Sequence, residues 1–110
     1  MENKEENMFD TEQLYSNGLW QVKNGKEIFF MALWKEFAET GLKNEGVIEA
    51  ALLQGVDNPN NFVSFGQWEN AEAAQKWQNS SAFKEYMAKF KELCDSMQIK
   101  ILKSVIKVKK

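Results

Sequence analysis

We predict an α+β domain of the ferredoxin-like type, with the element order β-α-β-β-α-β and helices on one face of an antiparallel four-stranded sheet. Apolar residues recur at helical spacing in two regions, and strand-like segments lie before, between and after them. The chain has 110 residues, which is enough for one domain with one core. The four expected strands are residues 14–23, 46–55, 61–68 and 98–109.

The composition narrows the classes of function. The chain has no histidine, no arginine and a single cysteine, Cys94. Histidine is the usual acid–base group at neutral pH and a common ligand of zinc and haem, so we expect no metal and no cofactor. A lone cysteine excludes an intramolecular disulfide. With a net charge of −2 and no arginine, the chain is not expected to bind nucleic acid.

The first residues predict a separate tail. Residues 1–12 hold five acidic side chains against Lys4 alone, and we expect them to be disordered. One folded domain then covers residues 13–110. The start lacks the basic and apolar regions of a secretory signal, and no apolar run reaches the ~20 residues that cross a bilayer. We therefore expect a cytoplasmic protein that does not contact membranes.

Residues 14–41 predict the first strand and the first helix. Gly18, within the strand, marks either a bulge or a close approach to the backbone, and the bulge is favoured. Asn24 is expected to cap the helix together with Glu27, and Gly41 to end it in the left-handed conformation. Trp34 is expected in the core because it belongs to one apolar stripe. The stripe comprises Phe30, Leu33, Trp34, Phe37 and Ala38.

The middle of the chain predicts a hairpin. Residues 46–55 carry apolar side chains on both faces, which is typical of a central strand. The turn residues 57–61 then lead into the third strand, residues 61–68. Alternate side chains of this strand point to one side of the sheet. They are Phe62, Ser64, Gly66 and Trp68.

The second helical region is predicted to be broken in two. Asn70 is expected to cap a short helix that carries Trp77, and Ser80 or Ser81 to cap a longer one. The apolar stripe of the longer helix includes Cys94, which predicts a buried, unreactive thiol. The other members of the stripe are Phe83, Tyr86, Met87, Phe90 and Met97.

The last strand, residues 98–109, predicts a second copy of the chain as partner. Its apolar positions change from odd to even numbers near Lys103 and Ser104, which indicates a bend there. Twelve residues exceed the length of a typical strand, so we expect the end to leave its own sheet. An apolar edge and an apolar sheet face need a cover. We expect a homodimer with sheet face against sheet face and the C-terminal strands crossing over.

Several segments together resemble the antibiotic biosynthesis monooxygenase superfamily, a group of dimeric α/β-barrel proteins. The resemblance covers about residues 14–108. It implies the same fold as the residue patterns, and in some members an oxidation of polycyclic aromatic substrates by dioxygen without metal, flavin or haem. The segments are VKNGKEIFFMALW (22–34), LLQ (52–54), DNPNNFVSFGQWENAEAAQKWQNSSAFKEY (57–86) and the closing Ile/Val strand.

The resemblance also shows where this chain departs from its relatives. Oxygenases of the family position the substrate with a strand asparagine and, four residues on, a tryptophan. Trp68 matches that tryptophan, but Ser64 stands at the asparagine position, and Ala74 stands where the family has a tyrosine. In members that degrade haem, a helix tryptophan precedes the axial histidine by ten residues. Trp77 matches the tryptophan and Met87 replaces the histidine, which argues against haem degradation.

We expect a ligand cavity between the sheet and the helices. The candidate substrate-binding residues are Trp20, Ser64, Trp68, Trp77, Phe83 and Met87. Each could instead serve only the core, and the helical spacing of Phe83 and Met87 favours that alternative. A buried Ser64 hydroxyl needs a hydrogen-bond partner.

Two functional hypotheses follow, from different classes. The first is a cofactor-independent monooxygenase that oxidises a small aromatic phenol or quinol with O2, in which the protein binds and desolvates the substrate. No catalytic base is identified, and Glu49 and Glu69 are only candidates for being near. The second is a non-catalytic dimer that binds a small hydrophobic ligand or has a stress-related role. A purely structural dimer is a third reading.

Overall fold

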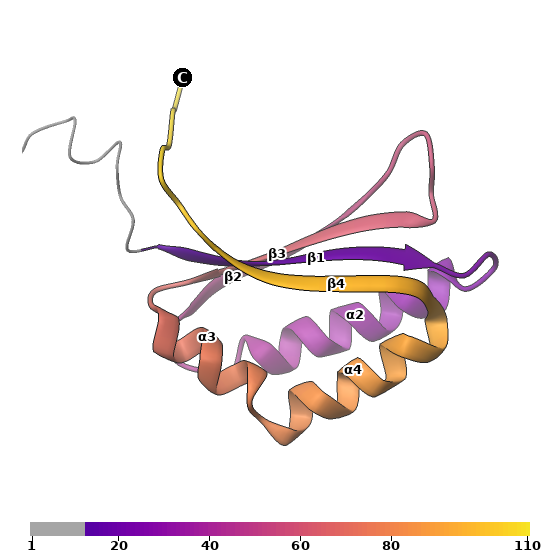
Figure 1. The fold of residues 1–110 in the computed structure, drawn as a ribbon, viewed down its shortest axis with the longest axis horizontal. Coiled ribbons are helices and arrows are strands. Elements are labelled where there is room, and N and C mark those ends of the chain that lie inside the picture. Colours follow the sequence, from indigo (N-terminus) through magenta and orange to yellow (C-terminus); the bar gives the residue numbers. More distant parts are fainter. Residues whose placement is uncertain (1–12) are drawn as a thin grey trace, which may run out of the picture.

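The computed structural model describes residues 13–110, so the tail predicted for residues 1–12 lies outside the described residues. The described chain forms a four-stranded antiparallel sheet, and all three of its helices lie on one face (Figure 1). The predicted α+β, ferredoxin-like fold is confirmed. The elements are β1 (Leu14–Val22), α2 (Glu27–Gly41), β2 (Val47–Gln54), β3 (Asn61–Trp68), α3 (Ala71–Gln78), α4 (Ser81–Leu93) and β4 (Cys94–Lys103).

The strand order is β2-β3-β1-β4, and this order corrects one prediction. The expected central position of the second strand is wrong, because β2 lies at an edge and pairs with β3 alone. Ala50 and Leu52 pack against the main core, whereas Leu53 on the other side stays 53% exposed. The apolar residues on both faces of β2 therefore mark an exposed apolar sheet face and not a central strand.

The helix ends follow local chemistry, with two differences from the prediction. Asn70 and Ser80 cap α3 and α4 as expected, since their side chains accept the backbone N–H groups of Ala73 and Phe83. Asn24 does not cap α2, because the chain turns before the helix, with Lys26 N bonded to Lys23 O at 2.9 Å. Gly41 does not adopt the left-handed conformation either, and its role is different, as described below.

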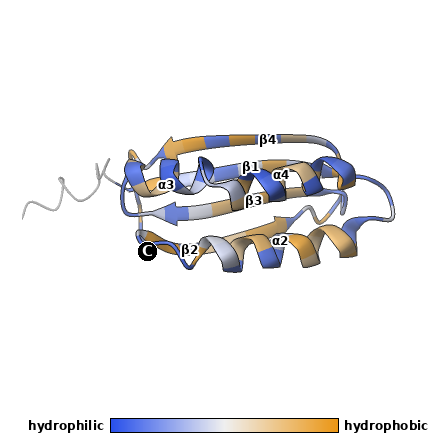
Figure 2. Ribbon diagram, turned by 90° about the horizontal axis from the view of Figure 1, so that it is seen from below, coloured by the Kyte–Doolittle hydropathy of each residue, from blue (hydrophilic) through white to orange (hydrophobic). Residues whose placement is uncertain are grey.

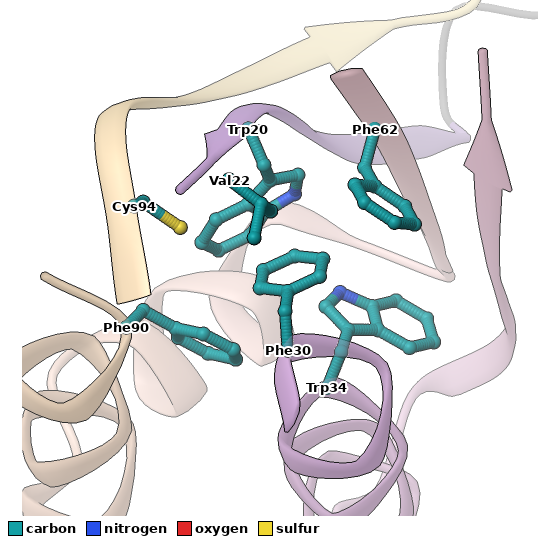
Figure 3. Close-up of a cluster of buried hydrophobic side chains, with 7 residues drawn as sticks. All are labelled: Trp20, Val22, Phe30, Trp34, Phe62, Phe90 and Cys94. Carbon is teal, nitrogen blue, oxygen red and sulfur yellow. The ribbon is translucent and has the colours of Figure 1, made fainter. Parts of the chain in front are cut away.

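The main core is a cluster of aromatic rings where the sheet meets α2 and α4 (Figure 3). The Trp20 ring lies 4.7 Å from Phe90 and 5.4 Å from Phe30, with tilted planes. Such ring pairs stabilise a core beyond the burial of their area. Phe30 and Phe90 are fully buried, so the cluster fixes both helices to the centre of the sheet. Its members are Trp20, Val22, Phe30, Trp34, Phe62, Phe90 and Cys94.

Cys94 is buried in this core as predicted, but it lies in a strand and not in a helix. Helix α4 ends at Leu93, whose carbonyl accepts the N–H of Lys23, and Cys94 pairs with Val22 in the sheet. Burial raises the pKa of the Cys94 thiol to about 11, with a smaller contribution from the neighbouring Asp95 carboxylate. The thiol is therefore protonated and unreactive at neutral pH.

The strand predicted over residues 98–109 is wrong at both ends, because β4 runs from Cys94 to Lys103, but the chain does leave the sheet at the predicted bend. Strand β4 ends at Lys103, and the Ser104 N–H donates to Gln13 O at 3.0 Å. Residues 104–110 then leave the sheet (Figure 1). Three apolar side chains of this segment are more than half exposed: Val105, Ile106 and Val108.

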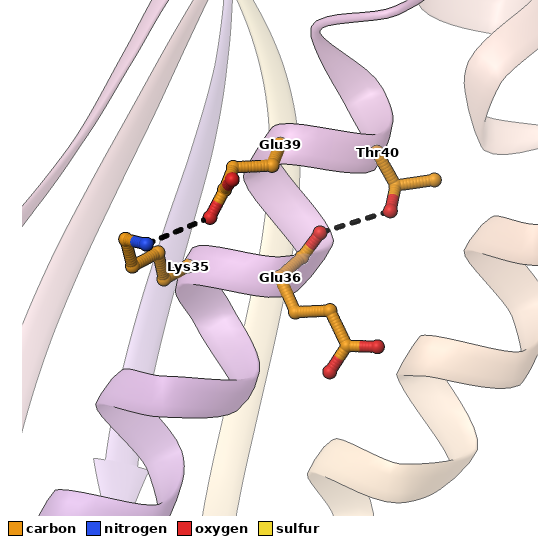
Figure 4. A network of polar contacts seen from close by, with 4 residues as sticks. All are labelled: Lys35, Glu36, Glu39 and Thr40. Atoms are coloured by element: carbon orange, nitrogen blue, oxygen red, sulfur yellow. Dashed lines mark hydrogen bonds and ion pairs between the residues drawn. The ribbon is translucent and has the colours of Figure 1, made fainter.

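Polar side chains on the outward face of α2 interact with one another and with Tyr86 of α4. Lys35 and Glu39 form an exposed ion pair at 3.0 Å, and Thr40 donates to the carbonyl oxygen of Glu36 (Figure 4). An exposed pair of this spacing contributes only about 0.3–0.5 kcal/mol. The hydroxyl of Tyr86 on α4 donates to the Glu36 carboxylate at 3.2 Å and lies 3.1 Å from Thr40 Oγ1.

The N-terminal half of α2 is hydrophobic along much of its length, whereas α4 alternates hydrophobic with hydrophilic residues (Figure 2). Four side chains of this half belong to the main core or pack against it, whereas the Phe29 side chain is 62% exposed. Among the described residues, no helix combines the length and apolar character needed to cross a bilayer.

Phe30→Ala is expected to lower the free energy of unfolding by about 3–5 kcal/mol, because the change leaves a cavity among the three rings that pack against Phe30. Phe29→Ala is the matched control and should change the stability by less than about 1 kcal/mol, since the ring is exposed. Urea unfolding followed by far-ultraviolet circular dichroism measures both. Equal losses in the two variants would contradict the described core.

Candidate functional site

Two copies of one five-residue pattern, Ser-x-Gly-x-Trp, form the centre of the sheet. They are SNGLW at residues 16–20 in β1 and SFGQW at residues 64–68 in β3. The antiparallel register places the glycine of each copy opposite the serine of the other. The pairs are Gly18 with Ser64 and Gly66 with Ser16. The two central strands are thus related locally by an approximate twofold axis.

Each tryptophan donates a hydrogen bond to the serine of the other strand. Trp20 Nε1 donates to Ser64 Oγ at 2.9 Å, and Trp68 Nε1 donates to Ser16 Oγ at 3.2 Å. Both rings are almost fully buried, with 2% and 3% of their surface exposed. The hydroxyl of the buried Ser64 therefore has its partner in a tryptophan.

The glycines make room for these rings. A Cβ atom on Gly18 would lie 2.4 Å from Trp20 Nε1 and 2.5 Å from Ser64 Oγ. A Cβ atom on Gly66 would lie 2.6 Å from Ser16 Oγ. The expected bulge at Gly18 is wrong, because the pairing of β1 is regular there and shifts only at Gln21 and Val22. Gly18 instead allows the Trp20 ring and the Ser64 hydroxyl to approach the backbone closely, which is the alternative that the sequence left open.

Beneath these strands lies a cavity of about 60 Å³. Most of its wall is apolar and includes seven aromatic residues, and Ser16 and Ser64 belong to it as well. The structure brings together five of the six candidate residues here: Trp20, Ser64, Trp68, Trp77 and Phe83. Met87 lies outside the wall, because it packs against the main core from α4.

The helical side of the cavity depends on Gly41. The Trp77 ring from α3 lies against this last residue of α2, where a Cβ atom would be 3.3 Å from Cε2 of the indole. Phe37 links the wall together, with its ring centroid 5.6 Å from Trp77 and 5.9 Å from Phe83. Gly41 therefore serves the packing of α3 on α2, which explains why it needs no left-handed conformation.

In the part of the chain that the structure describes, the cavity wall has few polar groups and no charged ones. Glu49 and Glu69, the carboxylates considered as nearby bases, are exposed and do not line it. Among the described residues, Trp34 Nε1 is a buried side-chain donor without a partner. Burying an unpaired donor costs about 1–3 kcal/mol. The described wall thus suits contact with an apolar ring, but it offers no acid or base for proton transfer.

Sequence reasoning missed three features of this site: Ser16, the role of Gly41, and the exposure of Trp34 to the cavity. The repeated Ser-x-Gly-x-Trp pattern is a visible signal for the first, since two equal patterns on neighbouring antiparallel strands can pair their residues reciprocally. The other two depend on how α3 packs on α2, and no local pattern reports that contact.

The fold recurs in solved structures of other proteins. A conserved protein from Methanosarcina mazei Go1 is 28% identical, with a TM-score of 0.77 over 84% of this chain and 92% of the other. A protein from Shewanella oneidensis is 18% identical, with a TM-score of 0.81 over 90% and 97%. SnoaB from Streptomyces nogalater, a cofactor-independent oxygenase, is 15% identical, with a TM-score of 0.77 over 83% and 91%. No curated protein matches the sequence.

The family model for antibiotic biosynthesis monooxygenases matches residues 14–89, from the start of β1 into α4. This match contains both Ser-x-Gly-x-Trp segments and the whole cavity wall except Ile99. More than half of the chain is covered, and the fold agrees with that of the solved oxygenase. The chain belongs to the antibiotic biosynthesis monooxygenase family.

Proposed function

We propose that the protein is a cofactor-independent monooxygenase that oxidises a small aromatic phenol or quinol with O2. The observation that carries this proposal is the aromatic cavity beneath β1 and β3, with four tryptophans in its wall. Family membership and the similarity to a cofactor-independent oxygenase support it. We place the activity in the cytoplasm, as the sequence predicts.

The electrons in this reaction come from the substrate. A phenol and one O2 give a quinone and one water, so one oxygen atom enters the ring and no external reductant is consumed. Apolar walls suit both an aromatic ring and dioxygen, and they remove water from around the reacting ring. Ser64, with Trp20 held on its oxygen, would keep the wall rigid during this step. Trp68 and Trp77 would lie against the ring.

The size of the cavity limits the substrate. A dry cavity of about 150 Å³ accommodates benzene, and the cavity here measures about 60 Å³. Even a single ring therefore requires the wall to move outward. Phe83 lies in the first turn of α4 and is only partly buried, so we expect its side chain to move outward when a ligand binds. We propose a single-ring substrate and not a polycyclic one.

Ala38→Leu is expected to abolish oxidation, because the added carbon atoms fill the cavity from α2. Ala32→Leu is the matched control on the exposed side of the same helix and should retain the wild-type rate. Oxygen uptake with methylhydroquinone, corrected for autoxidation in buffer, gives the rate, and chromatography identifies the product. The thermal midpoint of each variant shows whether overpacking alone has unfolded it.

Wild-type uptake equal to the buffer background would contradict the monooxygenase proposal. The absence of a base in the wall is the observation that favours the alternative, a non-catalytic protein that binds a small hydrophobic ligand. In that case methylhydroquinone would still bind to the wild type and the Ala32→Leu variant, without oxygen uptake, and would fail to bind to Ala38→Leu.

We further propose that two copies pair through the sheet face opposite the helices. Alternation along the strands turns four apolar side chains to this face, and 38–53% of each is exposed. They are Leu19, Leu53, Phe65 and Leu102. The exposed apolar segment 104–110 extends beyond the same sheet and would cross over to the second copy (Figure 1). An apolar area of this kind is typical of an interface.

Leu19→Lys is expected to convert the dimer into a monomer, because it places a charge at the centre of this face. Phe29→Lys is the control, since it adds the same charge at an exposed apolar site on α2. Sedimentation equilibrium should give twice the chain mass of 12.8 kDa for the wild type and for Phe29→Lys. A monomeric mass for the wild type in dilute solution would refute the proposal.

A further inference from the structure

We propose that Trp34 Nε1 is the polar anchor of the cavity, and that its ligand is a single aromatic ring carrying a carbonyl or similar acceptor oxygen. The inference rests on the proposed function only in taking the cavity as a ligand site. It adds which atom of the protein recognises the ligand and which atom of the ligand is recognised.

Trp34 differs from the two tryptophans of the sheet. Its side chain comes from α2 and is 9% exposed, and its nitrogen has no hydrogen-bond partner within residues 13–110. Trp20 and Trp68 also line the cavity, but each donates to a serine hydroxyl. Figure 3 shows the Trp34 ring beside Phe30 with its nitrogen on the side of the sheet. Trp34 thus belongs to the cavity wall, and its donor nitrogen is buried and unused.

No group of the described wall accepts the Trp34 N–H. The hydroxyl oxygens of Ser16 and Ser64 already accept the other two indole N–H groups, and the Ser64 carbonyl accepts from Asn17. Among the residues that the structure describes, no carboxylate lines the cavity. Buried N–H groups in folded proteins nearly always have a partner. A bound ligand would supply the acceptor that residues 13–110 do not provide.

The chemistry of the wall selects the class of ligand. A single donor among aromatic faces suits a neutral ring with one acceptor oxygen at its edge, since the faces pack on the ring and the N–H fixes its orientation. A cation would meet no negative group in the wall. The carbonyl of a single-ring quinone has this acceptor, and so does the oxygen of the phenol from which it forms.

Two probes of nearly equal shape separate this anchor from simple packing. Acetophenone carries a carbonyl oxygen, and α-methylstyrene carries a CH2 group in its place. The protein has four tryptophans, so an indole ¹⁵N–¹H spectrum has four signals, and Trp34→Phe identifies the signal of Trp34. Acetophenone is expected to move the Trp34 N–H signal downfield, as a new hydrogen bond does, whereas α-methylstyrene leaves the proton without an acceptor.

Trp34→Phe should weaken acetophenone binding roughly tenfold and leave α-methylstyrene binding unchanged. Equal weakening of both probes would overturn the proposal, because it would show a packing role. A Trp34 signal that acetophenone does not move, as a resident water molecule would leave it, would also overturn it. The wild-type titration decides the matter even if Trp34→Phe does not fold.

Binding and turnover can fail separately in this design. Acetophenone cannot be oxidised as a phenol is, so its binding to Trp34 does not depend on oxygenase activity. Anchored binding of acetophenone without oxygen uptake from methylhydroquinone would support the anchor and reject the monooxygenase. Oxygen uptake from methylhydroquinone without any effect of acetophenone on the Trp34 signal would support the monooxygenase and reject the anchor.

Discussion

The crossed hydrogen bonds between Trp20 and Ser64 and between Trp68 and Ser16 are the interaction on which the rest of the site depends. Gly18 leaves the space that the Trp20 indole needs, and Gly66 leaves the space for the Ser16 hydroxyl that accepts from Trp68. The two rings then form the sheet side of the cavity, while Trp20 also contacts Phe30 and Phe90 in the main core. One local arrangement therefore fixes both the packing of the helices and the wall of the site.

This arrangement also sets what the cavity can do. The serines use their oxygens on indole N–H groups, so the polar groups of the sheet are already paired, and Trp34 is left as an unpaired donor. With no charged group in the wall, the site favours a neutral aromatic molecule that carries its own reactivity. The proposed chemistry, in which the substrate provides the electrons, fits such a wall better than acid–base catalysis would.

The sequence predicts the fold well because strand alternation, helical stripes and caps such as Asn70 and Ser80 are local signals. It predicts five cavity residues because they follow the same alternation and stripes. It fails where the outcome depends on distant contacts. The edge position of β2 depends on which strand pairs with β1. The role of Gly41 depends on the packing of the Trp77 ring against it. Cys94 enters a strand because Val22 pairs with it.

A double-mutant cycle on Trp20→Phe and Ser64→Ala tests the central claim most directly. The four proteins differ only in the indole N–H, the serine hydroxyl or both, and urea unfolding gives the stability of each. We predict a coupling free energy of about 0.5–1.5 kcal/mol, the contribution of one buried hydrogen bond. A coupling near zero, with additive single effects, would show that the serine does not hold the ring and would contradict the account.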